Sequence, residues 1–398
     1  MGFLTAARAV LLHQKFICGI LAAAVLVCLA AFFVSCTSSG SGGLPHPLPG
    51  QNAYVTLPGT GNVLLLHIDG TTGEITPGTQ TPQVAATSPN GLALLGSKFL
   101  YVANAAASSI SIFSINSDGT LSLTGTPTLE RGSGPYAAVI DPSGSYLLVT
   151  NSLSNDVSVF SIDSSTGALQ EISGSPFYAN DNPTEILIMP SGQFVYVSNP
   201  SIGMVTAFTF DSSSGVLTPI QGSPFISGAG ASGLAIDGSE SYLYVANTSA
   251  VNPGSASVGN ISGFAINKTA GALFGALSPV AGSPFTSTVG SGPSALVVSQ
   301  GNKFLYATTP GSSYSIWCFL INPNGNGQLT AVSSSPFSDA AGDLFALIDS
   351  EGNFFYIGDG QAPGVAGYTY DPNSGQPTAI TNSPFTTGVA PGKMVIAH

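Results

Sequence analysis

A four-residue motif that recurs seven times is the feature that most limits what this chain of 398 residues can fold into. The copies vary around Tyr-Val-Ala-Asn, and they begin at Tyr54, Tyr101, Leu148, Tyr196, Tyr244, Tyr306 and Tyr356. Successive copies start 47, 47, 48, 48, 62 and 50 residues apart. Short aromatic and β-branched segments at a period in the forties are typical of the blades of a β-propeller.

Two further landmarks keep step with this motif. A turn that opens with Asp or Asn and closes with Gly follows the copies, at residues 69–73, 116–119, 163–167, 211–215, 267–271, 322–327 and 371–375. Such turns suit hairpins, because Asp and Asn side chains bond nearby backbone and Gly accepts a positive φ. A second hairpin precedes most copies, as around Asp141-Pro142-Ser143-Gly144. The sequence therefore predicts an all-β, seven-bladed β-propeller with four antiparallel strands per blade.

The two ends of the repeat region predict how the ring closes. The region spans residues 53–398, and its first motif, at Tyr54, already corresponds to a second strand. Residues 393–397 correspond instead to a first strand. We therefore expect the C-terminal strand to complete the first blade, which leaves no open sheet edge. Ser-Pro-Phe recurs at Ser175, Ser223, Ser283, Ser335 and Ser383, and its Phe is interpreted as packing between blades.

The first 52 residues differ in character from the repeats. Residues 1–35 combine Arg8 and Lys15 with an apolar run, which is typical of a signal peptide. Val34-Ser35-Cys36 resembles the lipobox of bacterial lipoproteins, which implies a lipid anchor at Cys36 in the cell envelope. Thr37, rather than Asp, after the cysteine resembles the sorting signal for the outer membrane. An uncleaved membrane anchor is the alternative, because the apolar run is nearly long enough to span a bilayer. Residues 36–52 are rich in Ser, Gly and Pro and predict a flexible tether.

Charge and cysteine content narrow the partners and the means of stabilisation. The chain has a net charge of −12, and residues 1–35 contain no acidic residue, so the exported part is more acidic still. Such a surface repels a phosphate backbone, which excludes nucleic acid as a partner. Cys318 is the only cysteine beyond Cys36, so we expect no intrachain disulfide and a buried role for Cys318. A monomeric propeller domain is expected.

The motifs together resemble the YVTN-type, lactonase-like seven-bladed propellers, a family that includes propeller-type bacterial 6-phosphogluconolactonases. The resemblance covers residues 53–398 and rests on the Tyr-Val-Ala/Ser-Asn copies, Asp141-Pro142-Ser143-Gly144 and the Ser-Thr-Gly-Ala-Leu turn that begins at Ser165. It implies a site with His, Arg and Glu around the top of the central channel. Beyond the leader this chain has Arg131 as its one arginine, and no histidine where the chain enters an inner strand.

The loops at one end of a propeller are where a site is expected, since binding and catalytic residues gather on loops over a rigid scaffold. The residues predicted to lie on this binding face are Asn104, Arg131, Tyr136, Asn151, Asp181, Glu185, Asn199, Asn247, Asp359 and Lys393. Glu185, Asp343 and Tyr136 are the candidates for a catalytic role. For the four asparagines a structural role at strand ends is the alternative.

No cofactor motif is present, but oxygen ligands for Ca²⁺ are a hypothesis that the carboxylates raise. Asp181, Glu185, Asp343 and Asp359 would supply them, although they come from scattered blades. His67 lies within an alternating run and is predicted to be a half-buried strand residue. The longest spacing includes residues 249–260, a small and polar loop that is either functional or irregular.

Three functions remain open at this point. The first is a membrane-tethered binding or interaction module whose loop face takes a protein, a glycan or a small molecule. The second is a lactone hydrolase of the 6-phosphogluconolactonase kind, with a carboxylate base and a divalent metal as an option. The third is a structural protein of the envelope.

Overall fold

The computed structural model describes residues 49–125, 128–129, 131–249, 259–286, 292–310, 315–322, 324–338, 343–359 and 363–397. All of them belong to one compact unit, Leu48–His398. The predicted signal peptide, the predicted lipidation site Cys36, most of the predicted tether and residues 250–258 of the long loop lie outside these ranges. In the part of the chain that the structure describes, no helix has the length and apolar character needed to cross a membrane.

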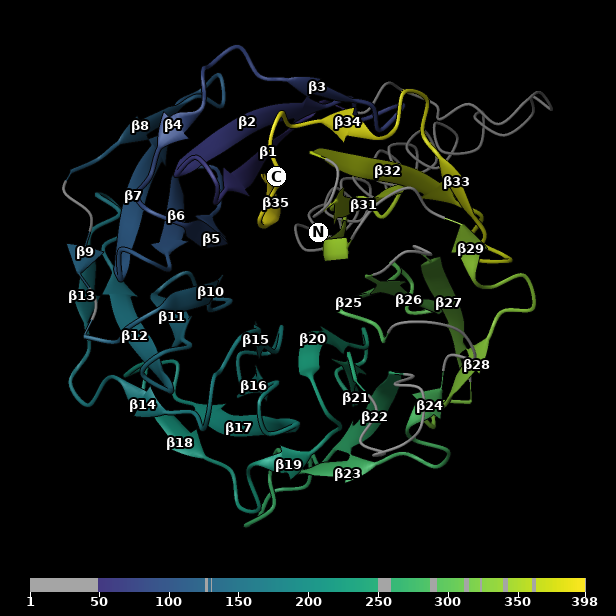
Figure 1. Ribbon diagram of the computed structural model, residues 1–398. Coiled ribbons are helices and arrows are strands. Elements are labelled where there is room, and N and C mark those ends of the chain that lie inside the picture. The colour runs from purple at the N-terminus through teal and green to yellow at the C-terminus, as the bar shows by residue number, and fades with distance from the viewer. Residues whose placement is uncertain are drawn as a thin grey trace, which may run out of the picture. The chain divides into compact units, whose positions relative to one another are not determined.

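The described residues form seven antiparallel sheets arranged in a ring, as predicted, and each sheet is one blade (Figure 1). Each blade has an inner, a second, a third and an outer strand in that order. A two-residue fifth strand, not predicted, pairs with the third strand.

The first three blades show the common order of strands, from the inner strand outwards and then the fifth strand. Blade 1 contains β35 (Met394–Ala397), β1 (Gln51–Leu57), β2 (Asn62–Ile68), β3 (Ile75–Pro77) and β4 (Gln83–Val84). Blade 2 contains β5 (Pro89–Leu95), β6 (Phe99–Asn104), β7 (Ser109–Ile115), β8 (Leu121–Leu123) and β9 (Thr128–Leu129). Blade 3 contains β10 (Pro135–Ile140), β11 (Tyr146–Asn151), β12 (Asp156–Ile162), β13 (Leu169–Glu171) and β14 (Phe177–Tyr178).

The remaining four blades repeat this plan. Blade 4 contains β15 (Ile186–Ile188), β16 (Phe194–Asn199), β17 (Met204–Phe210), β18 (Leu217–Pro219) and β19 (Phe225–Ile226). Blade 5 contains β20 (Ala231–Ile236), β21 (Tyr242–Asn247), β22 (Asn260–Ile266), β23 (Leu277–Pro279) and β24 (Phe285–Thr286). Blade 6 contains β25 (Ala295–Val298), β26 (Phe304–Thr309), β27 (Ser315–Ile321), β28 (Leu329–Ala331) and β29 (Phe337–Ser338). Blade 7 contains β30 (Asp343–Ile348), β31 (Phe354–Asp359), β32 (Gly364–Tyr370), β33 (Pro377–Ala379) and β34 (Phe385–Thr386).

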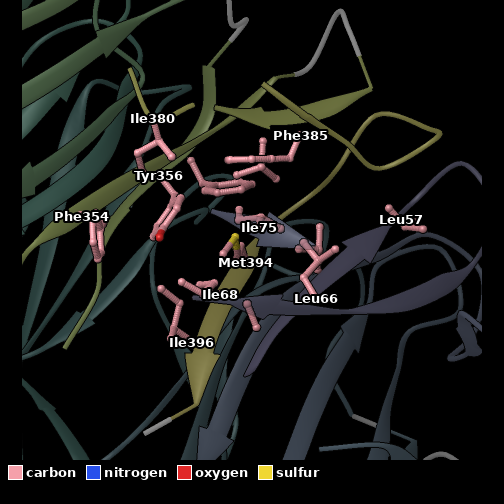
Figure 2. Close-up of a cluster of buried hydrophobic side chains, with 14 residues drawn as sticks. Leu57, Leu66, Ile68, Ile75, Phe354, Tyr356, Ile380, Phe385, Met394 and Ile396 are labelled. Atoms are coloured by element: carbon pink, nitrogen blue, oxygen red, sulfur yellow. The ribbon is translucent and has the colours of Figure 1, made fainter. Parts of the chain in front are cut away.

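The C-terminal strand closes the ring, which confirms the prediction from the chain ends. Strand β35 pairs with β1 in antiparallel register, from Asn52 opposite Ala397 to Val55 opposite Met394. Figure 2 shows Met394 and Ile396 of β35 in one buried cluster with side chains of blade 1 and blade 7, among them Tyr356. Burying two such side chains contributes several kcal/mol, at about 1.5–3 kcal/mol each.

The tyrosines of the recurring motif join each blade to the next. Each hydroxyl donates to the carbonyl of the glycine that closes the outer turn of the following blade, over 2.8–3.1 Å: Tyr54 to Gly119, Tyr101 to Gly167, Tyr196 to Gly275, Tyr244 to Gly327, Tyr306 to Gly375 and Tyr356 to Gly73. All six tyrosines are fully buried. The motif and the Asx-Gly turn therefore recur together because one hydrogen bond links them across the blade boundary.

Two blades depart from this scheme. Blade 3 has Leu148 in place of the tyrosine, and Tyr146 donates instead to Ser213 of blade 4 at an exposed position. In blade 5 the turn that begins at Asn267 closes with Gly275, where the Gly275 amide donates to the Asn267 carbonyl, rather than with Gly271 as the sequence predicted. The longer turn moves the acceptor glycine four positions along the chain without loss of the inter-blade bond.

The turn glycines are needed for space as well as for conformation. Gly73 has φ of +72°, and a Cβ atom there would lie 2.5 Å from Cδ1 of Phe354 in blade 7. An aromatic side chain two residues before the tyrosine thus packs directly onto the neighbouring turn. A side chain at Gly73 would force blades 7 and 1 apart.

The Ser-Pro-Phe segments tie the ends of blades 3 to 7 back onto the third strand of the same blade. The five serine hydroxyls accept the amides of Val159, Ala207, Gly263, Cys318 and Gly367 over 2.8–3.0 Å. The following Phe begins the short fifth strand, and the Ser-Pro bonds are cis.

Cys318 is fully buried, and burial raises the pKa of its thiol to about 12. His67 is half-buried in β2, with Nδ1 2.6 Å from Oδ1 of Asn52.

Candidate active site at the mouth of the central channel

The inner strands present one equivalent residue per blade near the channel mouth. In every blade the second residue of the recurring motif lies opposite one inner-strand residue, for example Met394 opposite Val55 and Ile186 opposite Val197. The residues that immediately precede these partners form a tier, which we call the channel tier: Lys393, Gly91, Ala137, Glu185, Gly233, Ala295 and Phe345 in blades 1 to 7. The tier thus contains two charged residues, of opposite sign.

The backbone around the channel tier is irregular in four blades. The register between the inner and second strands shifts between Pro89 and Leu92, and at the same place in the inner strands of blades 3, 5 and 7. A bulge of this kind re-aims side chains and is frequent next to active sites. At Gly91 and Gly233 an added Cβ would lie within 3 Å of the next inner strand, so glycine is required for the strands to approach.

Hydroxyls at the third motif position hold the charged tier residues in place. The Thr56 hydroxyl accepts the Lys393 amide at 2.9 Å and donates to the Asn90 carbonyl of blade 2 at 3.0 Å. The Ser198 hydroxyl accepts the Glu185 amide at 3.1 Å. Both backbones are therefore held by hydrogen bonds to the second strands.

Glu185 and Lys393 meet in an ion pair that joins blade 4 to blade 1, since Nζ of Lys393 donates to Oε1 of Glu185. The Glu185 and Lys393 side chains are 26% and 21% exposed, so the pair keeps limited contact with solvent. Burial by itself lowers the pKa of Lys393, but the Glu185 carboxylate and the nearby Tyr136 outweigh it, and the net pKa lies above the ordinary lysine value. Lys393 is therefore a protonated hydrogen-bond donor at neutral pH.

Three cavities follow one another from the channel mouth, and Lys393 lines the first two of them. The mouth cavity, about 290 Å³, is lined by Ser88, Asn90, Tyr136, Leu344 and Lys393, with loop residues. The middle cavity, about 190 Å³, is lined by Glu185, Lys393 and inner-strand residues of blades 5, 6 and 7. The lower cavity, about 370 Å³, is lined by Leu94, Leu347, Ile348, Met394 and their neighbours. Tyr136, Glu185 and Lys393, all predicted from the sequence, therefore gather at the first two cavities.

The four predicted asparagines lie beneath the binding face rather than on it. Asn104, Asn151, Asn199 and Asn247 end the second strands and are fully buried. Their amides donate to side chains of the third strand: Ser109 and Ser111, Asp156 and Ser158, Thr206, and Asn260 and Ser262. These hydrogen bonds join the ends of the second strands to the third strands within each of the four blades.

The other predicted residues are dispersed. Arg131 is on the outer rim, 65% exposed, with its Nε 3.1 Å from a carboxylate oxygen of Glu171. Asp181 lies exposed in the loop before β15, and Asp359 is buried at the end of β31. Asp343 pairs with Asp359 through the backbone at the start of β30.

The Ca²⁺ hypothesis gains no site from this arrangement. Among the residues that the structure describes, no group of three or more His, Cys, Asp or Glu side chains is placed to hold a metal ion. Glu185 already has Lys393 as its charged partner.

Sequence reasoning missed Ser88 and Asn90, which line the mouth cavity with Tyr136. A signal was present, because Asn90 follows Pro89 at the entry to its inner strand in the same way that Tyr136 follows Pro135.

Together the site offers a carboxylate, an ammonium group, a phenol and an amide within one channel mouth. A carboxylate can accept a proton from water, and cationic or hydroxyl donors can stabilise an oxyanion.

The fold and this site define a seven-bladed propeller with a polar channel mouth. The sequence matches the family described as lactonase, 7-bladed beta-propeller, over residues 46–180, 173–273 and 257–390. The chain belongs to this family.

Curated relatives and solved structures agree with this assignment. A 6-phosphogluconolactonase from Formosa agariphila is 46% identical over 89 residues, which are 21% of this chain and 23% of that protein. One from Pectobacterium carotovorum is 36% identical over 87 residues, 22% of this chain and 24% of that protein. The chain thus aligns with about a quarter of the length of these relatives.

The structure of the periplasmic gluconolactonase from Pseudomonas aeruginosa superposes with a TM-score of 0.71 at 16% identity, and the match covers 88% of this chain and 99% of that chain. A Lactobacillus plantarum protein gives 0.72 at 15% identity, with 88% and 100% covered. At such identities these two structures support the fold.

Proposed function

We propose that this protein hydrolyses a lactone at the mouth of its central channel. The observation that carries the proposal is the Glu185–Lys393 pair, which lines a cavity in the middle of the propeller and is flanked by Tyr136. Membership of the lactonase family and the similarity to 6-phosphogluconolactonases support the same reaction class. Histidine and arginine are not needed in this scheme, because the carboxylate and the ammonium group take the two roles that the reaction requires.

The chemistry assigns one step to each group. The Glu185 carboxylate accepts a proton from a water molecule, and the water oxygen forms a bond to the lactone carbonyl carbon. The Lys393 ammonium group stabilises the resulting oxyanion, and Tyr136 is the second donor from the mouth cavity. When the tetrahedral intermediate collapses, the ring C–O bond breaks and the leaving oxygen takes the proton back from Glu185. The product is a hydroxy acid.

The raised pKa of Lys393 suits this role. A lysine that stays protonated at neutral pH can hold an oxyanion without giving up its proton. The ion pair also keeps Glu185 beside its partner before substrate arrives, which fixes the geometry of the base.

The test is hydrolysis of glucono-δ-lactone, 6-phosphogluconolactone and γ-lactones with alkyl tails, followed by acid release, in the wild-type chain and in Glu185→Gln and Lys393→Gln. Loss of a general base or of an oxyanion donor is expected to lower kcat/KM by about 100-fold or more. Glu171→Gln and Arg131→Gln are the matched controls, because they make the same chemical changes in the pair on the outer rim. They should leave turnover within about twofold of wild type.

Two results would overturn the proposal. One is wild-type turnover that Glu185→Gln leaves unchanged. The other is binding of the lactone or its hydroxy acid at the mouth with no turnover, which would favour the binding-module function.

We also propose that residues 1–35 export the chain and that a lipid on Cys36 anchors it in the outer membrane. The sequence pattern around Cys36 supports this. Cells grown with labelled palmitate should label the wild-type chain and the Cys318→Ser control, but not Cys36→Ser. Labelling that persists in Cys36→Ser would contradict the anchor.

A further inference from the structure

The channel below the ion pair is apolar, and this bears on which lactone the site would take. The lower cavity, about 370 Å³, is lined by Leu94, Gly96, Leu347, Ile348, Met394, Val395 and Ile396. None of these seven residues carries a charged or polar side chain. A mouth with four polar side chains therefore leads toward a lining of leucine, isoleucine, valine and methionine.

The cavities share lining residues, so they are consecutive parts of one channel. Lys393 lines both the mouth and the middle cavity, while Leu347 and Met394 line both the middle and the lower cavity. The residue numbers rise in step along each inner strand, from Leu344 to Leu347 to Ile348 in β30. A group that extends past the Glu185–Lys393 pair therefore enters the apolar part.

The charges at the mouth leave no surplus cation for a phosphorylated substrate. Among the described residues that line the three cavities, Lys393 is the one cation, and Glu185 is paired with it. The chain as a whole carries a net charge of −12, which repels an anion on approach. Desolvating a phosphate without a cationic partner is costly.

We propose that the substrate is an uncharged lactone with an aliphatic tail. The ring lies at the Glu185–Lys393 pair with its carbonyl toward Lys393, and the tail occupies the lower cavity. This inference rests on the hydrolase function proposed above and specifies its substrate class. The tail contributes binding through burial of apolar surface, and the ring contributes the reacting ester.

The test uses the full-length chain and a series of γ-lactones whose alkyl tail lengthens from none through ethyl and butyl to hexyl, with 6-phosphogluconolactone as the charged reference. Each buried methylene should raise kcat/KM about fourfold until the tail reaches the end of the lower cavity. The charged reference should be turned over more slowly than the hexyl compound. Calorimetric binding of the matching alkyl γ-lactams, which resist hydrolysis, should show the same gain in affinity.

Cavity-filling variants locate the tail. Leu347→Phe narrows the junction of the middle and lower cavities and should remove the gain in kcat/KM from the longer tails, measured relative to the unsubstituted ring in the same variant. Leu94→Phe fills space within the lower cavity and should also remove the gain from the longer tails. It replaces Leu347→Phe in the test if that variant does not fold. Leu123→Phe, on an exposed outer strand, is the matched control and should keep the full gain.

The outcomes separate the two proposals. Turnover that is independent of tail length, or faster with the charged lactone, overturns the substrate class and leaves the hydrolase in place. Lactam affinity that rises with tail length, without turnover of any lactone, supports the tail site and overturns the hydrolase. Neither binding nor turnover overturns both.

Discussion

The boundaries between blades and the mouth of the channel are two regions built from the same strands. The boundaries repeat one contact, whereas the mouth varies from blade to blade. Between blades, one arrangement is repeated: a buried tyrosine hydroxyl on one blade and a turn carbonyl on the next, at six boundaries among the described residues. At the mouth, seven equivalent positions of the channel tier hold five different residue types, and charge appears at Glu185 and Lys393.

This difference separates scaffold from site. A residue that recurs in phase with the repeat solves a problem that every blade has, namely packing against its neighbour. A residue that breaks the repeat at an equivalent position cannot be explained by that problem. Glu185 and Lys393 are such residues, and the structure pairs them across the ring. The same contrast predicts that changes between blades alter stability, whereas changes in the channel tier alter activity.

The largest effect should come from deleting residues 394–398, which removes β35 from blade 1. The deletion exposes the edge of β1 and takes Met394 and Ile396 out of the buried cluster between blades 1 and 7. We expect no cooperative thermal transition and concentration-dependent aggregation, measured by calorimetry and light scattering. Lys393→Gln, which leaves β35 intact, is the control. A truncated chain with wild-type melting behaviour would contradict closure by β35.

The second largest effect should come from alkaline pH, which should break the tyrosine hydrogen bonds between blades. Burial, with a smaller contribution from Asp118, raises the pKa of Tyr54 to about 12, and burial raises the pKa of the five other buried motif tyrosines as well. Unfolded tyrosines ionise near pH 10, so the unfolded state loses protons first. The stabilisation is complete below pH 10 and is lost as the pH rises through the folded pKa values.

The measurement is a titration from pH 9 to about pH 12.5 that follows tyrosinate absorbance and circular dichroism together. We expect most of the tyrosinate signal to appear with the loss of β structure. Chain unfolded in denaturant is the control, and it should titrate near pH 10. Full tyrosine ionisation near pH 10 in a chain that keeps its fold would contradict the burial of these hydroxyls.

A single inter-blade bond should have a smaller effect that depends on burial. Tyr356→Phe leaves the buried Gly73 carbonyl without its donor and should cost about 1–3 kcal/mol of unfolding free energy. Tyr146→Phe removes the exposed counterpart to Ser213, where water replaces the bond, and should cost less than about 1 kcal/mol. Chemical denaturation measures both, with the exposed Tyr178→Phe as control. Equal losses for Tyr356 and Tyr146 would refute burial as the cause.

The smallest effect on stability should come from the charged tier residues. A double-mutant cycle of Glu185→Gln and Lys393→Gln should give a coupling of about 1 kcal/mol in unfolding free energy, because both side chains keep some solvent contact. The rim pair, Arg131 with Glu171, should couple by less than about 0.5 kcal/mol, since Arg131 is mostly exposed. A coupling free energy above about 3 kcal/mol would mean that the Glu185–Lys393 pair mainly stabilises the fold.

Much of the architecture was predictable because it depends on short-range sequence patterns. Strand alternation, turns that need Asp or Asn and Gly, and a period in the forties depend on residues near one another in the sequence. The closing strand was predictable for the same reason, since residues 393–397 repeat the pattern of other inner strands. The errors were local too: the turn of blade 5 closes at Gly275 because a longer loop reaches the same acceptor position.

The site was predictable only in part. Tyr136, Glu185 and Lys393 were placed near the channel because their position in the repeat is known, but nothing in the sequence pairs residues that lie 208 positions apart. The asparagines that end the second strands were expected on the surface. They are buried because their amides bond the third-strand side chains, an interaction between neighbouring strands that periodicity does not reveal.

The sequence by itself therefore determined the blade, its number of copies and the strand that closes the ring, because these follow from backbone preference and apolar alternation over short stretches. Only the tertiary structure decided that motif tyrosines bond the next blade's turns, that Glu185 faces Lys393 and that an apolar cavity follows. The physical reason is that ring closure sets which distant side chains share a channel, and that geometry depends on all seven blades at once.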